Sequence, residues 1–220
     1  MAGLPLFPLK TVLYPGAALP LHVFEERYKL MIEHCVDGDS TFGVVLIKSG
    51  SEVGGPAEPY EVGTRARITE VVRLDDGRLN ILTRGEERFR IARLIQLRPY
   101  LKAEVETFAD QLGEDAPGEA LVARVTSLYA AYIRLLLALS GQWQRRVPLS
   151  HSPDEISFSV AHALRVDLSL KQALLEDPSP SSRLMSEEAL LEKEIGQLRR
   201  AVRQRWFSPG GTGFPVPSAV

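Results

Sequence analysis

Residues 60–83 read YEVGTRARITEVVRLDDGRLNILT, and this stretch decides the fold of the first half of the chain. Apolar and polar side chains alternate over residues 60–73, which is the period-2 pattern of a strand with one buried face. The side chains expected on that face are Val62, Ala66, Ile68 and Val72. Asp75-Asp76-Gly77 predicts a hairpin turn, because glycine accepts a positive φ and aspartate tolerates one. The returning strand should carry Leu79, Ile81 and Thr83 inward.

Further short segments on both sides extend this β-rich region. Residues 6–9 lie among prolines and predict an edge strand, because proline cannot donate to a ladder. Residues 42–47 form a continuous apolar run, typical of a strand buried on both faces. Residues 25–36 predict one amphipathic helix, with Tyr28, Met31, Ile32 and Cys35 on its apolar face. Residues 1–110 therefore predict a twisted sheet or small barrel with one embedded helix, and not a doubly wound α/β fold.

The second half of the chain has helical periodicity, so the fold class is α+β. Residues 120–140 predict a helix, and Ser152-Pro153-Asp154-Glu155 is a typical helix start. Asp167 is expected to cap another helix, which ends before Pro178. A last helix over residues 183–206 should bury Leu184, Leu191, Ile195, Leu198 and Val202 and turn Glu187 and its other charged residues outward. We assign a helical bundle to residues 115–206 and a flexible Gly/Pro tail to residues 207–220.

Composition limits the function classes. The formal net charge of −2 gives no general attraction to nucleic acid or to anionic membranes. Cys35 is the single cysteine, so no intrachain disulfide can form, which fits a reducing cytoplasm. The N-terminus lacks the basic segment of a secretory signal, and the longest apolar run, residues 133–139, is far short of the roughly 20 residues that span a bilayer. We expect a soluble cytoplasmic protein with no membrane association.

Motifs for catalysis, cofactors and metals are weak. The glycine-rich residues 50–55 are followed by Pro56 and Ala57 and not by the lysine and hydroxyl residue of a phosphate-binding loop. The four histidines show no converging metal-ligand pattern, and Cys35 lies on an apolar helix face, where an inert thiol is expected. His151 and Asp154 stand near Ser150 and Ser152, but no nucleophile elbow is present. We expect no enzyme, no cofactor and no metal, and keep hydrolysis by these residues as the least favoured alternative.

Arginines make the middle of the chain locally basic. They are Arg65, Arg67, Arg73, Arg84, Arg88, Arg90 and Arg93. Solvent-facing strand positions are the favoured interpretation, because the aromatic side chains that would stack bases are missing. Nucleic acid is therefore not the expected partner, although RNA or a small molecule is kept as the alternative ligand.

Ordered segments of the chain resemble the N-terminal, substrate-binding domain of Lon proteases. The segments LPLFPL (4–9), VLYPG (12–16), LPLHVFEERY (19–28), FGVVLI (42–47), VGTRA (62–66), DGRLNI (76–81), GEERFRI (85–91), PYLKA (99–103), KQALLE (171–176) and RL (183–184) carry the likeness. It extends over roughly residues 4–205. One segment alone would be weak, whereas this many in the same order are specific.

The resemblance implies a PUA-like pseudo-barrel followed by a helical bundle, and a role in binding unfolded polypeptide or a partner protein. It implies no ATPase or protease part within these residues. Extended peptides can add to a sheet edge or insert apolar side chains into pockets. The residues predicted to offer such a surface are Leu13, Tyr14, Pro15 and Phe24.

Overall fold

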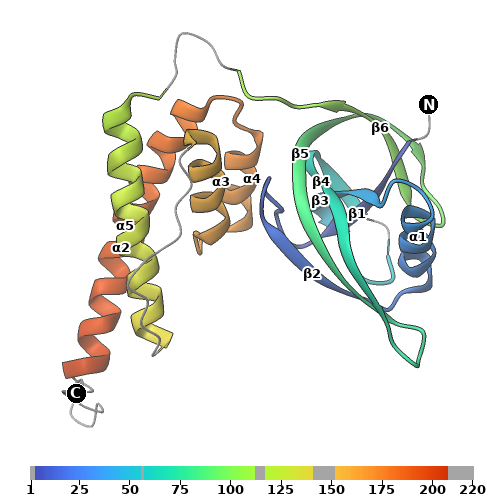
Figure 1. The fold of residues 1–220 in the computed structure, drawn as a ribbon, viewed down its shortest axis with the longest axis horizontal. Helices are drawn as coiled ribbons and strands as arrows, with labels where there is room; N and C mark the ends of the chain where they lie inside the picture. The colour runs from blue at the N-terminus through green and yellow to red at the C-terminus, as the bar shows by residue number, and fades with distance from the viewer. Residues whose placement is uncertain (1–2, 56, 112–116, 141–151, 208–220) are drawn as a thin grey trace.

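The computed structural model describes residues 3–55, 57–111, 117–140 and 152–207. It has a β-rich lobe followed by a helical lobe (Figure 1). The elements of the β-rich lobe are β1 (Leu4–Leu9), β2 (Ala18–Val23), α1 (Glu26–Val36), β3 (Thr41–Gly50), β4 (Ala57–Arg73), β5 (Leu79–Gln96) and β6 (Leu101–Thr107). The helical lobe contains α2 (Glu119–Ser140), α3 (Pro153–Ala163), α4 (Leu168–Glu176) and α5 (Pro180–Phe207). The predicted α+β class, with one helix embedded in the strands, is confirmed.

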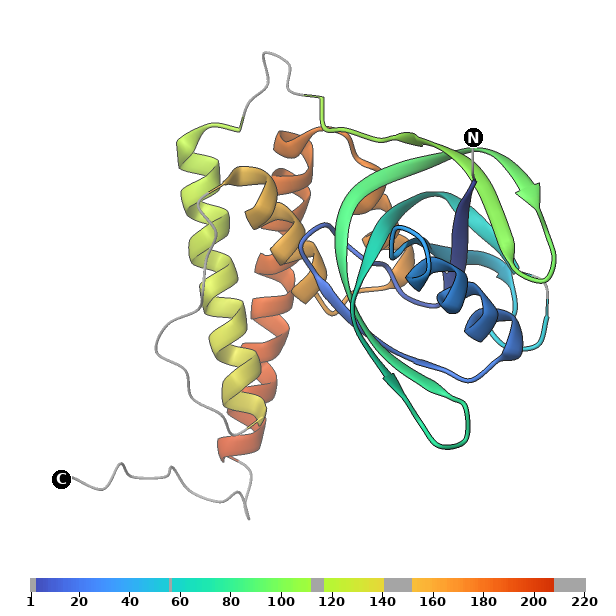
Figure 2. The same cartoon turned by 45° about the vertical axis from the view of Figure 1, so that its right-hand side comes forward.

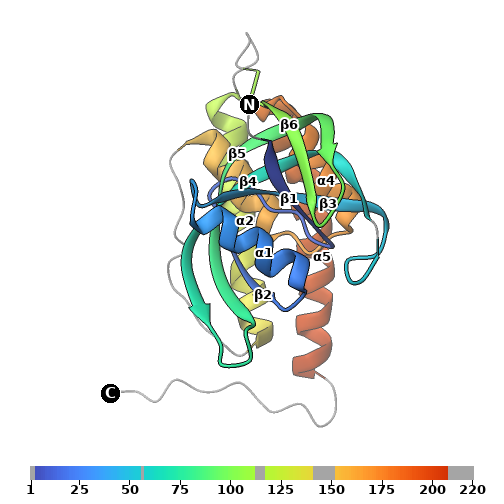
Figure 3. The same cartoon turned by 90° about the vertical axis from the view of Figure 1, so that its right-hand side faces the viewer.

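The strands form a closed ring with one strand attached outside it. The sheet order is β2-β5-β4-β3-β1-β6, and β6 pairs back onto β5. The ring is therefore β5-β4-β3-β1-β6, while β2 pairs only with β5 among the described strands. A barrel of this kind removes most free strand edges, so the unpaired side of β2 is an exception. Helix α1 covers the side of the barrel that faces away from the helical lobe (Figures 1 and 3).

The prediction of β1 as an edge strand is wrong. β1 lies inside the ring, parallel to β3 and antiparallel to β6. Pro5 falls where β1 pairs with β6 alone, and Pro8 falls where it pairs with β3 alone. Each proline thus has a strand on one side only, so its missing N–H leaves no ladder position empty.

The predicted alternation of β4 holds only as far as Ile68. Val62 and Ala66 are buried, but Val72 is 53% exposed and Val71 packs against the barrel core in its place. The pairing with β5 steps from Ile68 to Glu70 against consecutive β5 residues, so one extra residue interrupts the ladder. Such a bulge reverses which side chains face inward. On β5, by contrast, Leu79, Ile81 and Thr83 are buried as predicted, and Gly77 has the expected positive φ of 78°.

The helical lobe lies on one side of the barrel, with α4 next to β4, and α2 and α5 lie side by side as the outermost pair (Figure 2). A core cluster joins the two lobes: Val12, Tyr14, Leu46 and Val62 come from the barrel, and Phe158, Leu174, Leu175 and Leu191 are among its members from the helices. A second cluster fills the space between the barrel and α1. The lobes are therefore joined by apolar packing as well as by the chain.

Helix ends agree in part with prediction. The Ser152 hydroxyl accepts a hydrogen bond from the Glu155 N–H at 3.1 Å, as expected for a cap. Asp167 occupies the N-cap position of α4, but its side chain makes no capping hydrogen bond. Glu187, expected on the outer face of α5, is fully buried, because that side of α5 packs on α3 and Ser157.

Helix α2 is long and apolar enough to cross a membrane by length and composition, and only 17% of its apolar window is buried. The core helix of a folded protein can meet the same test. Here α2 packs along α5, and the two are joined by an ion pair between Arg124 and Glu188. Length and composition alone do not assign α2 to a membrane.

Candidate functional site

The first candidate site is an apolar groove between β1 and the unpaired side of β2, which we call the β1–β2 groove. Its volume is about 240 Å³. Its lining residues are Phe7, Leu9, Pro20, Leu21, His22, Val23, Phe24, Glu25, Tyr28, Glu52 and Val53. The rings of Phe7 and Tyr28, which both line the groove, stack with their centroids 4.1 Å apart. Phe24 and Val53 are 49% and 54% exposed, so two large apolar side chains stand at its rim without cover.

One wall of this groove is the glycine-rich loop of residues 50–55. The Gly54 N–H donates to the Glu25 carboxylate at 3.2 Å, and Arg27 donates to the Gly55 carbonyl at 3.2 Å. The Arg27 guanidinium also lies 4.5 Å from the centroid of the Tyr28 ring. These contacts tie the loop to the start of α1. The loop that the sequence offered as a weak phosphate-binding candidate therefore forms the side of an apolar groove.

The four residues predicted as a binding surface do not lie together. Leu13 is in the barrel core and is 2% exposed. Tyr14 is fully buried between the lobes, where its hydroxyl donates to the Lys171 carbonyl at 2.8 Å. Burial, followed by the charge of Glu187, raises the pKa of Tyr14. Phe24 lines the β1–β2 groove, and Pro15 lines a different groove between the lobes.

That second hollow, the inter-lobe groove, is larger, and Arg84, Glu86 and Glu155 are among its lining residues. It has a volume of about 640 Å³ and is lined by Pro15, Gly16, Ala17, Ala18, Arg84, Glu86, Tyr129, Glu155, Phe158, Ser159 and His162. Burial, and then the charge of Lys171, lowers the pKa of His162, so this imidazole is neutral at pH 7. Glu86 forms an ion pair with Arg67. The groove offers mixed polar groups and one exposed backbone turn at Gly16.

Beside the inter-lobe groove, a buried ionic cluster joins barrel and helices. Arg88 of β5 donates to the carbonyls of Leu175 and Asp177 at 2.7 and 2.9 Å and pairs with Asp110. Arg183 of α5 binds the same Asp110 carboxylate and the Asp177 carbonyl. We call Arg88, Asp110 and Arg183 the inter-lobe clamp. Arg88, predicted to face solvent, is instead buried, because the helical lobe covers that outer face of the barrel.

Next to the clamp, Arg183 donates to the Ser157 hydroxyl at 3.1 Å, and Ser157 donates to Glu187 Oε1 at 2.9 Å. Among the described residues, Oε2 of Glu187 has no hydrogen-bond partner. Burial raises the pKa of Glu187 well above that of a free glutamate, against the lowering effects of Ser157 and Arg183. A carboxyl buried in this way favours its neutral form.

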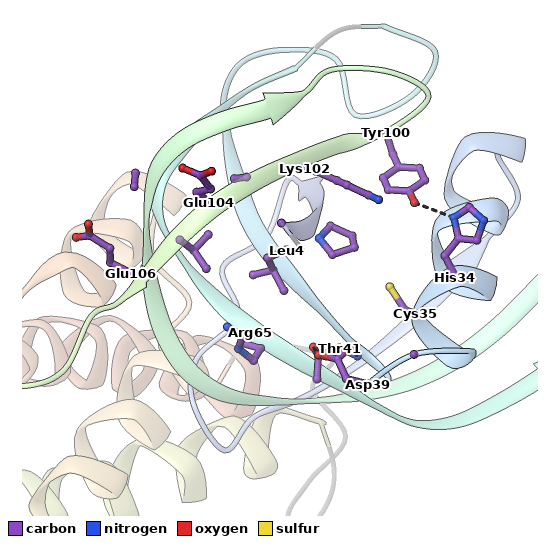
Figure 4. Close-up of a pocket in the computed structure, with 16 residues that line it drawn as sticks. Leu4, His34, Cys35, Asp39, Thr41, Arg65, Tyr100, Lys102, Glu104 and Glu106 are labelled. Atoms are coloured by element: carbon purple, nitrogen blue, oxygen red, sulfur yellow. Dashed lines mark hydrogen bonds between the residues drawn. The ribbon is translucent and has the colours of Figure 1, made fainter. Parts of the chain in front are cut away.

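A third hollow of about 580 Å³ lies between the C-terminal end of α1 and strand β6 (Figure 4). The His34 ring and the Tyr100 hydroxyl are hydrogen-bonded at 2.8 Å, and Lys102 lies over the Tyr100 ring. Both signs of charge line it, with Arg65 and Lys102 against Asp39, Glu104 and Glu106. This mixed lining favours no one class of charged ligand.

Reactive groups are scarce among the residues that the structure describes. Burial, followed by the charge of Asp39, raises the pKa of Cys35 to about 12, so its thiol is protonated and unreactive at neutral pH. In the described ranges, no group of three His, Cys, Asp or Glu residues is placed to hold a metal ion. Ser150 and His151, candidates for the least favoured hydrolase, lie outside those ranges, as does the side chain of Asp154.

Comparisons with known proteins give one consistent result. Residues 3–193 match the family model described as the ATP-dependent protease La (LON) substrate-binding domain. Lon protease 2 of Myxococcus xanthus is 30% identical over 194 residues, which are 87% of this chain and 24% of that protein. Lon protease of Escherichia coli K12 is 27% identical over 92% of this chain and 26% of its own length. The chain thus spans about a quarter of the length of these curated relatives.

Solved structures with a similar fold are also N-terminal domains of Lon proteins. The crystal structure of a Lon N-terminal domain protein from Xanthomonas campestris is 29% identical, has a TM-score of 0.64, and is covered over 98% of its length and 86% of this chain. The N-terminal domain of Mycobacterium avium complex Lon protease is 18% identical with a TM-score of 0.59, a likeness of fold alone. The family model covers most of the residues that build the barrel, the clamp and the helices, and the chain belongs to the Lon substrate-binding domain family.

Proposed function

We propose that this chain is a non-catalytic module that binds extended apolar segments of unfolded polypeptides or partner proteins in the β1–β2 groove. The observation that carries the proposal is a groove lined by Phe7, Leu9 and Tyr28. Phe24 and Val53 are exposed at its rim. The family's description as a substrate-binding domain of a protease supports a role in substrate recognition for proteolysis. We place that role in the cytoplasm and assign it no cofactor.

The geometry suits an extended segment. In such a segment alternate side chains point the same way, so one can enter the groove while its neighbours stay in solvent. The unpaired side of β2 lies beside the groove and offers backbone groups to the segment. Pro20 interrupts β2 and has no N–H, so a full ladder cannot form there. Apolar side chains entering the groove therefore supply most of the affinity.

A fluorescence-anisotropy titration tests the proposal. The probe is a labelled twelve-residue peptide with alternating aromatic and aliphatic residues, compared with an all-polar peptide of equal length. Phe24→Ala and Val53→Ser should each weaken binding at least fivefold, because each removes apolar area from the rim. Val72→Ser is the matched control, since Val72 is equally exposed but lies on the β4–β5 hairpin.

Binding that is absent at 100 µM peptide would contradict the proposal. Equal losses from Val53→Ser and Val72→Ser would also contradict it, because they would indicate a general surface effect. Retention of the all-polar peptide with equal affinity would show that apolar side chains do not direct binding.

RNA as ligand is less favoured by the charge arrangement. Arg65, Arg67 and Arg93 form ion pairs with Glu87, Glu86 and Glu104 respectively. Carboxylates at these positions cancel the positive potential that phosphate contacts require. Arg88 is unavailable to any external phosphate because it is buried in the clamp.

A further inference from the structure

The charged side chains that line the β1–β2 groove are both acidic. Glu25 and Glu52 belong to its lining, and none of its lining residues in the described part of the chain is a lysine or an arginine. The apolar groove is thus bordered by carboxylates. Which of them is offset by a cation of the protein decides what the groove can select besides apolar side chains.

Glu25 is neutralised within the protein. Nη2 of Arg27 lies 3.0 Å from Oε2 of Glu25, and the same oxygen accepts a hydrogen bond from the Gly54 N–H at 3.2 Å. These contacts hold the Glu25 carboxylate in the wall of the groove, so its charge is already used.

Glu52 is not neutralised in this way. The contact from Arg27 goes to its backbone, where Nη2 donates to the Glu52 carbonyl at 3.5 Å. Among the residues that the structure describes, the Glu52 carboxylate has no ion pair and no hydrogen-bond partner, although its residue is partly buried. A partly buried charge attracts an opposite charge more strongly than a fully solvated one, because the effective dielectric constant is lower.

Other cations on the surrounding elements leave this balance unchanged. Three of them have a carboxylate of their own at 2.6, 3.5 and 2.5 Å: Lys29 with Glu26, Lys48 with Glu58, and Arg78 with Asp76. Lys10 follows β1 and does not line the groove. Glu52 therefore gives the groove a negative charge that no lining cation offsets.

The imidazole of His22, which also lines the groove, adds no positive charge in this arrangement. Its Nδ1 lies 2.7 Å from Oδ1 of Asn80, and its Nε2 lies 3.3 Å from Nη1 of Arg78. Because a guanidinium group can only donate, Nε2 accepts and the proton lies on Nδ1. This is the neutral tautomer of the ring.

The charge of Glu52 acts on the apolar surface of the groove. Burial raises the pKa of Tyr28, the charge of Arg27 lowers it, and the charges of Glu25 and Glu52 raise it. A carboxylate raises the pKa of a phenol in this way by the negative potential that it produces there. The potential of Glu52 thus extends to a ring that an entering side chain would contact.

We propose that the β1–β2 groove selects extended apolar segments that carry a lysine or arginine close to the side chain that enters it, and that Glu52 determines this preference. The inference rests on the proposed function, because it requires that such segments bind in the groove. Residues of an extended segment are about 3.3 Å apart, so a neighbouring lysine can reach the loop of residues 50–55 while the apolar side chain is in the groove. An acidic side chain at the same place would be repelled by Glu52.

Anisotropy titrations with three labelled twelve-residue peptides test the preference. The peptides share one central apolar sequence and carry lysine, glutamine or glutamate at the same flanking positions. The lysine peptide should bind the original chain about fivefold more tightly than the glutamine peptide, which is the size expected of one partly exposed ion pair. The glutamate peptide should bind more weakly than both. High NaCl should reduce these differences, because salt screens exposed charges.

Three variants assign the preference to one side chain, with circular dichroism to confirm folding. Glu52→Gln should make the lysine and glutamine peptides bind alike, and should leave the affinity for the glutamine peptide unchanged. Glu52→Lys should reverse the order of the lysine and glutamate peptides. Glu33→Gln is the matched control, because it removes the same charge from an exposed glutamate of α1 that does not line the groove.

Equal affinities of the original chain for the lysine and glutamate peptides would overturn the inference. A lysine preference that survives Glu52→Gln, or that Glu33→Gln removes to the same extent, would also overturn it. In these cases the glutamine peptide still binds, so the proposed function stands. If none of the three peptides binds, the groove is not a peptide site, and the proposed function and the preference fail together.

Discussion

Glu187 is a carboxyl group in the interior, held by one hydroxyl and facing Arg183. The position of Glu187 in the sequence already indicates that its side chain is buried. Leu184 lies three residues before it and Leu191 four residues after it, so helical periodicity places all three on one side of α5. The charge of Glu187 led to the prediction that it faces solvent. Its helical spacing from Leu184 and Leu191 correctly indicates the buried side. A buried polar side chain of this kind specifies how α5 fits against α3.

Replacing Glu187 by glutamine should stabilise the protein at neutral and mildly alkaline pH. The folded pKa of Glu187 is raised, so its contribution to folding is fully present below the unfolded value near 4.5 and is lost as pH rises toward the folded pKa. Glutamine keeps the acceptor for Ser157 and does not ionise. The variant should therefore be more stable than the original chain at pH 8, and the difference should vanish at pH 4.

Urea unfolding at pH 4, 6 and 8 measures this difference. Glu192→Gln, an exposed glutamate one turn further along α5, is the control and should show no such pH dependence. A Glu187→Gln variant that is less stable than the original chain at pH 8 would contradict the expected sign.

At the scale of helices and strands, periodicity predicted well where the segments lie in the sequence. It predicted poorly which segments pair with one another. Four of the five predicted helices begin within one residue of the observed ones, while the last begins at Pro180 rather than at residue 183. The place of β1 inside the ring could not be derived, because a strand's neighbours depend on pairings with residues far along the chain. The wrong prediction that Val72 faces inward has the same origin, because the local sequence does not indicate the bulge after Ile68.

The β1–β2 groove was beyond the reach of sequence patterns for a related reason. Its lining comes from residues 7–9, 20–28 and 52–53, which are brought together only when the barrel and α1 are assembled. Phe24, one of the four residues predicted to bind a peptide, is exposed and lines the groove. Leu13 and Tyr14 are buried, and the sequence around them does not show it, because the helical lobe and the barrel core that bury them lie elsewhere in the sequence.

Gly63 lies where β3 and β4 approach each other closely. A Cβ atom there would lie 2.5 Å from the Val44 carbonyl oxygen and 2.6 Å from Val45 Cγ1, and backbone cannot move aside cheaply. Gly63→Ala should therefore destabilise the protein by about 2 kcal/mol, as overpacked core positions do. Chemical denaturation measures the loss. Gly118→Ser, at a position with nothing within 4 Å, should change stability little; equal losses from both changes would contradict the steric account.

Helix α3 depends on its cap. Ser152→Ala removes the acceptor for the Glu155 N–H and should reduce the free energy of unfolding by about 1 kcal/mol. Ser152→Asp should retain most of it, because a carboxylate oxygen accepts the same bond and suits the positive end of the helix dipole. Thermal melts of both variants check this, and an alanine variant as stable as the aspartate variant would show that the cap contributes nothing.

For the whole molecule, the inter-lobe clamp links barrel and helices by buried polar contacts, and we expect the two lobes to unfold as one cooperative unit. Asp110 holds two guanidinium groups, Arg88 and Arg183, whose side chains are 2% and 0% exposed. Removing a buried counter-charge leaves the arginines uncompensated, so Asp110→Asn should destabilise the protein by about 3 kcal/mol. Arg93→Ala, which breaks an exposed pair with Glu104, should change stability by no more than about 0.5 kcal/mol.

The same variants test cooperativity. Near-ultraviolet and far-ultraviolet circular dichroism should give coincident urea transitions for the original chain and separated transitions for Asp110→Asn, because the shared counter-charge of Arg88 and Arg183 is then lost. Coincident transitions in both proteins would show that the shared apolar core and the direct hydrogen bonds of Arg88 and Tyr14 couple the lobes without the Asp110 charge.

The segment that leaves β6 is fastened along its length: Phe108 donates to Arg88, Asp110 joins the clamp, and Gln111 donates to the Pro178 carbonyl. With these contacts the segment is a fixed connection between barrel and helices and not a flexible linker. If α5 is displaced, these contacts should carry the barrel with it. A polypeptide bound in the β1–β2 groove, as we propose, would then move together with the last helix.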